Sequence, residues 1–517
     1  MYDLGLLGGL IVDGKRTEPY RANLYIKDGK IACITDQMLA ATEILDVSGL
    51  TVAPGFIDIH SHSDSIPFRA RTPQAKIRQG VTTEVIGNCG TSIFPGLESR
   101  KEECEAFNRA KRNHPGFMSV TEYSKAVNSI GHVCNCAPLL GHSNLRIAVM
   151  GHVNRAPSDK EMAALKDLLD REMARGAFGM SLGLIYPPSA FSAKEELIEL
   201  AKVIAKHGGI LAVHMRNEGP RLFEAVDEMI EIAERSGVHI QVSHLKLMGT
   251  PQWGKAPKLI EKIDAARRRG LNITCDQYPF TASSTSMSAM VPHWAHEGGA
   301  DFMCKRLEAR EGDICESIGA EMANRGGPDA VLVISVRDNP QYAGKYVSEI
   351  AEMLDLSPVE AVRRMLLEGG GSASCIYFSM DQQDVEYIMK QTYICVGSDG
   401  SAYDYDHPTN LHPRNFAAFS QYFQTVREKG ILPLQDMVYK ASELTASILG
   451  ITDRGTLEEG KWADIAVFDS DAYSSRSTFL APMTPPAGMY HVLVNGQFAV
   501  RNNALTGIAA GKGIVKE

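Results

Sequence analysis

Apolar runs recur about every thirty residues through the middle of this chain, close to the length of one βα unit. Glycines stand at the same interval, at Gly176, Gly208, Gly237 and Gly270, and each follows a helical pattern and precedes an apolar run. Runs that are apolar throughout are typical of parallel strands buried on both faces. The spacing therefore predicts a series of βα units around one parallel sheet.

Eight such runs can be counted, and eight strands alternating with helices favour a closed (β/α)8 barrel of the TIM type over an open sheet. They are GFIDIHSHSD, VTTEVIGNCG, NCAPLLGHSNLR, GAFGMSLGL, GILAVHMRN, VHIQVSHLK, LNITCDQYPF and YICVGSDG. The clearest helix is SAKEELIELAKVIAKHGG, in which Ser192 and Glu195 are predicted to form a capping box. The expected fold class is α/β.

Both ends of the chain are rich in short strands, with turn dipeptides at Asp28-Gly29 and Asn495-Gly496. We expect residues 1–54 and 451–500 to form one small β-sandwich domain beside a barrel at 55–450. The stretch from about 285 to 390 is too long for an ordinary connection, so it is predicted to be an insertion over the barrel mouth. The Gly- and Ala-rich tail at 501–517 is expected to be loosely ordered.

Charge and composition limit the partners. Acidic residues exceed basic ones by 62 − 53 = 9, which argues against nucleic acid or an anionic membrane as the main partner. No apolar run approaches the ~18 residues of a membrane span, and the N-terminus lacks the basic region of a secretory signal. The ten cysteines are scattered without a CxxC pair, which favours a reduced, cytoplasmic location. A small-molecule partner is expected, and the oligomeric state is left open.

Groups able to bind a metal or move a proton end five of the eight runs. Barrel enzymes place their sites at the C-terminal ends of the strands, so these groups are expected to meet at the barrel mouth. They are His60 and His62 on the first run, Cys89 on the second, His214 on the fifth, His244 on the sixth and Asp399 on the eighth.

The chemistry of these groups points to a metal site. His60 and His62 lie two residues apart, so their side chains share one side of a strand. Imidazole and thiolate ligands suit zinc, and Asp399 offers a carboxylate that could accept a proton from water. Taken singly, each residue has a simpler explanation, such as a buried core cysteine or an aspartate in a turn. Their joint placement favours the metal site.

Longer motifs resemble a known family. TVAPGFIDIHSHSD resembles the first-strand signature of the amidohydrolase superfamily, and GTLEEGKWADIAVFD resembles its return to the small β domain. Within that superfamily the chain resembles the N-acyl-D-amino-acid deacylases, or D-aminoacylases, from Gly5 to about Gly496. The motifs that carry this resemblance are GNCG, SLGLIYPP, VHMRNEG, VSHLK, DQYPFTASST and SDG with a later HPR.

The resemblance implies roles for matching residues. Cys89, His214 and His244 would hold one tightly bound zinc, and His60 and His62, with Cys89 as a bridge, a possible second and weaker one. Asp399 would be the general base and acid. The substrate's α-carboxylate would be bound by Lys246, Tyr278 and Arg414, whose charged and phenolic donors suit a carboxylate, and the substrate pocket would include Ser284 and Tyr186.

The predicted function is therefore zinc-dependent hydrolysis of the amide bond of N-acyl-D-amino acids. The stretch from Pro279 to Ala300 contains no Arg or Lys, and it offers apolar residues such as Met287 to bind the substrate side chain. Because an unpaired buried charge is expensive, we expect a preference for neutral or apolar D-side chains. The alternatives are a dipeptidase for a C-terminal D-residue, a cyclic-amide hydrolase, and a non-catalytic scaffold, which would be expected to have lost a ligand or Asp399.

Overall fold

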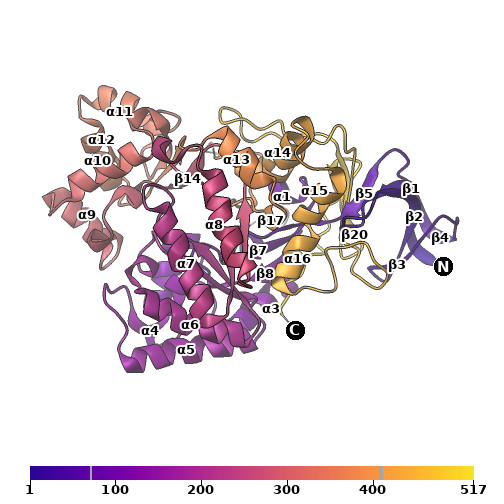
Figure 1. The fold of residues 1–517 in the computed structure, drawn as a ribbon, viewed down its shortest axis with the longest axis horizontal. Coiled ribbons are helices and arrows are strands. Elements are labelled where there is room, and N and C mark those ends of the chain that lie inside the picture. The colour runs from indigo at the N-terminus through magenta and orange to yellow at the C-terminus, as the bar shows by residue number, and fades with distance from the viewer. Residues whose placement is uncertain (70–72, 407–410, 517) are drawn as a thin grey trace.

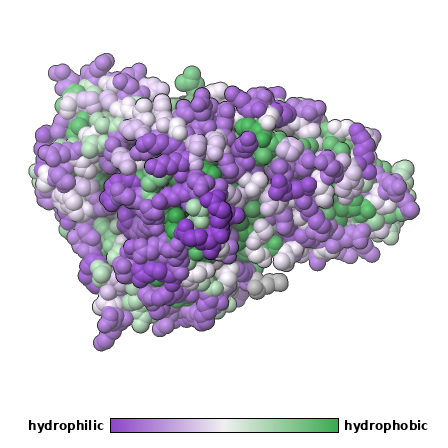
Figure 2. Space-filling model, viewed as in Figure 1, coloured by the Kyte–Doolittle hydropathy of each residue, from purple (hydrophilic) through white to green (hydrophobic). Residues whose placement is uncertain are grey.

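The computed structural model describes residues 1–69, 73–406 and 411–516. A parallel barrel occupies the middle of the molecule, and a helical insertion and a small β domain lie at opposite ends of it (Figure 1). No helix in the described residues is both long and apolar enough to cross a membrane. The face in view in Figure 2 is mostly hydrophilic, with apolar residues scattered over it.

All eight predicted strands form, and they pair in parallel in the order of the chain. The barrel closes where the Asp399 amide donates to the His60 carbonyl at 2.8 Å and Ser61 bridges to Gly400. The predicted barrel is thus confirmed. Its strands are β6 (Phe56–Asp58), β7 (Val81–Ile86), β8 (Asn135–Pro138) continued by β9 (Leu140–Gly141), β10 (Gly179–Gly183), β11 (Ile210–His214), β12 (His239–Val242), β13 (Ile273–Gln277) and β17 (Ile394–Val396).

Helices follow each strand and bury their apolar faces against the barrel. They are α1 (Gln74–Ile77), α2 (Lys101–Arg112), α3 (Val120–Ile130), α4 (His142–Met150), α5 (Asp159–Ala174), α6 (Lys194–Lys206), α7 (Leu222–Ser236), α8 (Ala256–Arg268), α13 (Gln382–Met389), α14 (Arg414–Glu428), α15 (Leu434–Ala441) and α16 (Glu443–Leu449). The predicted capping box is wrong, because α6 starts at Lys194 and the Ser192 hydroxyl donates to Glu196 instead, at 3.3 Å.

The two ends of the chain pair in one nine-stranded sheet. Ile465 and Val467 face the core of this domain, whereas Ala466 and Phe468, which alternate with them, face the barrel. The alternation joins the two units through a shared strand. The strands are β1 (Tyr2–Ile11), β2 (Tyr20–Lys27), β3 (Lys30–Thr35), β4 (Ala41–Asp46), β5 (Thr51–Pro54), β18 (Ile465–Phe468), β19 (Met489–Val494), β20 (Gln497–Arg501) and β21 (Ala504–Leu505).

The insertion after β13 has a sheet and a core of its own. It contains β14 (Ser283–Ser286), α9 (Ala300–Ala309), α10 (Ile314–Asn324), β15 (Val331–Val336), α11 (Val347–Leu354), α12 (Pro358–Glu368) and β16 (Ala373–Tyr377). The next helix, α13, packs against α8 of the barrel. We therefore place the end of the insertion before α13 rather than near residue 390.

The C-terminal tail corrects a prediction, because it is ordered against the barrel. The Lys512 carbonyl accepts from the Cys136 amide at 2.8 Å, and the Ile514 amide donates back to Cys136 at 2.9 Å. The Lys516 amide donates to Gly176 at 2.8 Å. The tail thus lies along the N-terminal ends of β8 and β10, opposite the barrel mouth. The small residues of the tail allow its backbone to lie close to the barrel, so they do not indicate disorder.

Candidate active site

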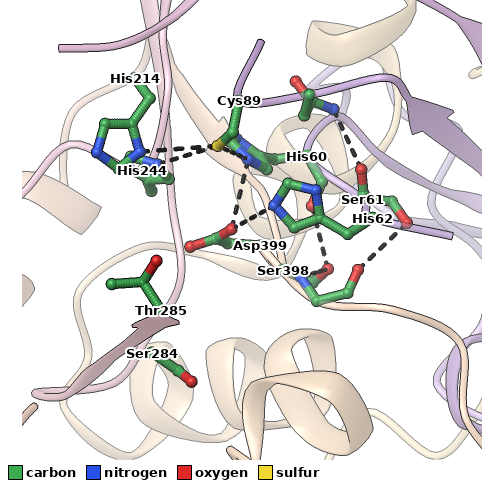
Figure 3. Close-up of polar contacts among 12 residues, drawn as sticks. His60, Ser61, His62, Cys89, His214, His244, Ser284, Thr285, Ser398 and Asp399 are labelled. Carbon is green, nitrogen blue, oxygen red and sulfur yellow. Dashed lines mark hydrogen bonds and ion pairs between the residues drawn. The ribbon is translucent and has the colours of Figure 1, made fainter. Parts of the chain in front are cut away.

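The predicted metal-binding residues meet at the barrel mouth (Figure 3). Cys89, His244 and Asp399 each have a positive φ, of 53°, 38° and 49°, a conformation uncommon for residues other than glycine. Such backbone costs about 1–3 kcal/mol and tends to occur at functional sites. Gly183 of β10 packs against the backbone at Cys89, where a Cβ atom on residue 183 would lie 2.2 Å from the Cys89 carbonyl oxygen.

The Cys89 sulfur lies between two sets of histidines. Its Sγ is 3.7 Å from His214 Nδ1 and 3.6 Å from His244 Nε2 on one side, and 3.3 Å from His60 Nε2 on the other. Cys89, His214 and His244 form one group whose ligand atoms lie within 4.8 Å of one another. His214 Nε2 is buried without a hydrogen-bond partner. One sulfur and two imidazole nitrogens fit a cation such as zinc.

A second group shares Cys89 and adds His60, His62 and Asp399. Asp399 Oδ1 lies 2.9 Å from His62 Nε2 and 3.5 Å from His60 Nε2. The structure thus brings all five predicted ligands and the predicted proton carrier together. Their roles as ligands and proton carrier stay predictions.

The surroundings of Cys89 and His244 favour the charged forms of both side chains. Burial opposes ionisation of the Cys89 thiol, but the charge of His60 and hydrogen bonds from three histidines hold its pKa well below the usual value. Burial likewise disfavours a charged His244, yet the nearby carboxylates Glu218 and Asp399 raise its pKa to about 9. Without a metal, protonated imidazoles therefore balance the thiolate. A divalent cation would replace that positive charge.

Asp399 is ionised in this environment. Burial alone would raise its pKa, but the charges of Arg414 and His244 and a hydrogen bond from His62 hold that pKa well below its ordinary range. The carboxylate is therefore available as a proton acceptor at neutral pH.

The three residues predicted to bind the substrate carboxylate also lie together. Lys246 Nζ lies 5.7 Å and Arg414 Cζ 5.2 Å from the centroid of the Tyr278 ring. The Tyr278 hydroxyl is buried without a hydrogen-bond partner. Lys246 and Arg414 line the same cavity as Cys89 and Asp399. Such a cluster can bind an anionic group beside the proposed metal position.

Comparison with known proteins identifies the family of this chain. A model described as "Amidohydrolase family" matches residues 43–500. The chain belongs to the amidohydrolase family.

Three relatives within the amidohydrolases are especially similar. D-aminoacylase of Alcaligenes xylosoxydans xylosoxydans is 35% identical, covering 99% of this chain and 97% of the relative. N-acyl-D-glutamate deacylase of the same organism is 34% identical, covering 96% and 93%. A crystal structure of N-acyl-D-glutamate deacylase from Bordetella bronchiseptica, complexed with zinc and a phosphonate inhibitor, has a TM-score of 0.85, 31% identity and 99% coverage of each chain.

The amidohydrolase site opens into a cavity of about 1210 Å³ between the barrel and the insertion. Tyr186 and Ser284 line it, as predicted for pocket residues. The Tyr186 hydroxyl bonds the Thr285 hydroxyl at 2.7 Å, which joins the loop after β10 to the insertion. Ser284 meets Arg414 through its carbonyl oxygen, at 2.9 Å, rather than through its hydroxyl.

Met287 does not fit its predicted place. It is fully buried in the core of the insertion and is absent from the cavity lining. The apolar run after β14 forms a 3₁₀ helix, and this turn directs the Met287 side chain into the insertion. We therefore withdraw Met287 as a substrate-binding residue.

Residues that the sequence analysis missed support the amidohydrolase site from behind. Asp276 Oδ1 lies 3.3 Å from His60 Nδ1 and accepts from the His244 amide at 2.8 Å. Arg112 Nη2 lies 3.2 Å from His62 Nδ1. Glu218 contacts both His244 and Lys246. Asp276 and Glu218 lie in the motifs DQYP and VHMRNEG, so the sequence did contain a signal for them. Nothing in the sequence showed that these two carboxylates would lie beside the proposed ligands.

Proposed function

We propose that this chain hydrolyses the amide bond of N-acyl-D-amino acids in a zinc-dependent reaction, giving a carboxylic acid and a free D-amino acid. One observation carries the proposal. A cysteine–histidine cluster, an ionised Asp399 and the cations Lys246 and Arg414 line the same cavity. The relatives named above support the substrate class, since they are deacylases of N-acyl-D-amino acids.

The tightly bound zinc would be held by Cys89, His214 and His244. A possible second and weaker zinc would be held by His60 and His62, which share Cys89 with the first. The thiolate and imidazole donors fit such a cation. When bound, zinc polarises a carbonyl and lowers the pKa of water.

Asp399 would carry protons in both halves of the reaction. It accepts a proton from the attacking water as the new C–O bond forms. It then returns that proton to the amide nitrogen as the C–N bond breaks, because an amine leaves poorly unless it is protonated. Its ionised state and its position beside His62 support the first transfer.

Lys246, Arg414 and Tyr278 would bind the α-carboxylate and so fix the substrate relative to Asp399. Tyr186 and Ser284 would contact the rest of the substrate. Holding the carboxylate on one side limits which enantiomer can present its amide to the site. This arrangement supports selection of one enantiomer, and the relatives support the D form.

A preference for neutral or apolar D-side chains is part of the proposal. Arg216 and Arg325 line the cavity, but they are paired with Glu228 and Glu321. Among the other described cations of the lining, Lys111 and Arg337 are exposed, and Arg112 lies 3.4 Å from Asp64. An acidic side chain would therefore have to displace an existing pair or remain in solvent.

A second candidate is a dipeptidase that acts on a C-terminal D-residue. The volume of the cavity supports this candidate. At about 1210 Å³ it exceeds the volume that a drug-sized ligand usually requires. The two activities differ only in the acyl half. We also infer a cytoplasmic location, which the ten free cysteines support.

Hydrolysis of a substrate panel tests the proposal. The panel contains N-acetyl-D- and N-acetyl-L-amino acids, dipeptides with a C-terminal D-residue, and a cyclic amide, with zinc measured on the same protein sample. Release of free D-amino acid from the N-acetyl substrates, lost on chelation and restored by zinc, is the expected result. Turnover of the cyclic amide alone would contradict it.

A further inference from the structure

Glu218 lies between the proposed metal site and the proposed carboxylate-binding site. It follows β11, four residues after His214, and its side chain is buried at the cavity wall. Oε1 lies 2.6 Å from Lys246 Nζ and 2.9 Å from His244 Nδ1, and Oε2 lies 3.9 Å from His214 Nε2. One carboxylate therefore contacts a proposed zinc ligand and a proposed substrate-binding cation at once.

The nitrogen of His244 that faces away from Cys89 has two competing neighbours. His244 Nδ1 lies 2.7 Å from Lys246 Nζ as well as 2.9 Å from Glu218 Oε1. An ammonium group can only donate a hydrogen bond, and a carboxylate can only accept one. Nδ1 can therefore accept from Lys246 or donate to Glu218, but it cannot do both.

A proton or a cation on Nε2 decides between the two neighbours. His244 Nε2 points to Cys89, so a ring that gives its Nε2 lone pair to a cation carries its hydrogen on Nδ1. Such a ring can donate to Glu218, whereas the Lys246 ammonium then faces another N–H group and is repelled. Histidine ligands commonly donate their second nitrogen to a carboxylate in this way.

We propose that Glu218 is a positioning residue that holds His244 with its hydrogen on Nδ1, the tautomer needed for the metal, and holds Lys246 at the cavity wall. The inference rests on the proposed function for the role of Lys246.

The test compares zinc affinity in matched variants, measured by competition with a chelator. Glu218→Gln keeps the shape of the side chain but removes its charge, and it is expected to weaken zinc binding about 10- to 100-fold. Glu228→Gln is the control, because Glu228 pairs with Arg216 at the same cavity and touches none of the proposed ligands. It should leave zinc affinity unchanged. Zinc affinity of Glu218→Gln within twofold of the parent protein would overturn the proposal.

Lys246→Met supplies an independent arm. Removing the competing donor should leave zinc affinity equal to or higher than that of the parent protein. A loss of zinc affinity of about tenfold or more would mean that Lys246 supports the ring, and it would overturn the proposal even if Glu218→Gln did not fold.

Kinetics at saturating zinc give a further readout. Glu218→Gln should raise KM, because Lys246 is no longer held at the cavity wall to bind the substrate carboxylate. An unchanged KM would contradict the role of Glu218 in placing Lys246. The affinity measurements need no turnover, so failure of the proposed activity with the predicted zinc affinities would reject the proposed function and leave the role of Glu218 in metal binding standing.

Discussion

Arg414 Nη1 lies 2.8 Å from Asp399 Oδ2, so the proposed proton carrier is paired with a proposed substrate-binding cation. Both side chains are buried, which makes the pair sensitive to any anion that enters the cavity. A substrate carboxylate that binds Arg414 would compete with Asp399 for the guanidinium. Binding of the substrate would then release the base at the moment when it is needed.

Asp399→Asn tests the proton carrier. The substitution keeps the size of the side chain, so we expect the fold and most of the zinc to remain. It removes the proton acceptor, and we expect kcat to fall roughly 10²–10⁴-fold, the scale of general acid–base groups. The measurements are kcat, zinc content and Tm on one preparation. A loss in kcat of less than tenfold would exclude Asp399 from the mechanism.

Cys89→Ala tests the metal site. The sulfur is the common member of both ligand groups, so its removal should abolish stoichiometric zinc binding and activity together. Cys33→Ala is the matched control, since Cys33 lies on β3 of the small β domain. Zinc per chain is measured by atomic absorption. Full zinc and full activity in Cys89→Ala would show that Cys89 is only a core residue.

Recognition of the carboxylate can be tested on the substrate as well as on the protein. A substrate amide in place of the acid loses a charge-assisted hydrogen bond, worth about 1.5–3 kcal/mol, or about 10- to 150-fold in kcat/KM. Lys246→Met and Arg414→Met should reduce kcat/KM for the acid by similar factors and bring acid and amide closer together. Equal turnover of acid and amide by the parent protein would remove the carboxylate site from the account.

Selectivity for the D-side chain follows from the charges in the cavity. We expect N-acetyl-D-Met, -D-Leu and -D-Phe to be better substrates than N-acetyl-D-Glu and -D-Asp. Differences among the apolar substrates should be modest, because one buried methylene is worth roughly 1 kcal/mol. The kcat/KM values of these five substrates decide the point. If N-acetyl-D-Glu ranks first, Arg216 or Arg325 must exchange its present partner for the substrate.

The barrel could be predicted because its signals are local. Eight apolar runs had to be buried on both faces, and the groups that end five of these runs had to meet at one mouth. The positions of Cys89 and Asp399 follow from that rule alone. Family motifs then supplied Lys246 and Arg414, which no pattern of spacing would have distinguished from surface cations.

The errors arose where tertiary contacts outweigh local pattern. Ser192 resembles a helix cap, but the buried pair of Arg146 and Glu196 offers its hydroxyl a stronger partner. Met287 resembles a pocket residue, but the insertion has a core of its own to fill. Glu218 was overlooked because a carboxylate in a loop looks like a surface group until β11 and β12 bring His244 and Lys246 beside it.

The central claim is most directly tested by the enantiomer ratio on protein of known zinc content. We predict that zinc-loaded protein hydrolyses N-acetyl-D-Met with a kcat/KM about 10²-fold or more above that for N-acetyl-L-Met, since a misplaced amide carbon costs about that much. Chelation should abolish the D-activity. Equal rates for the two enantiomers, or hydrolysis that persists without zinc, would contradict the account.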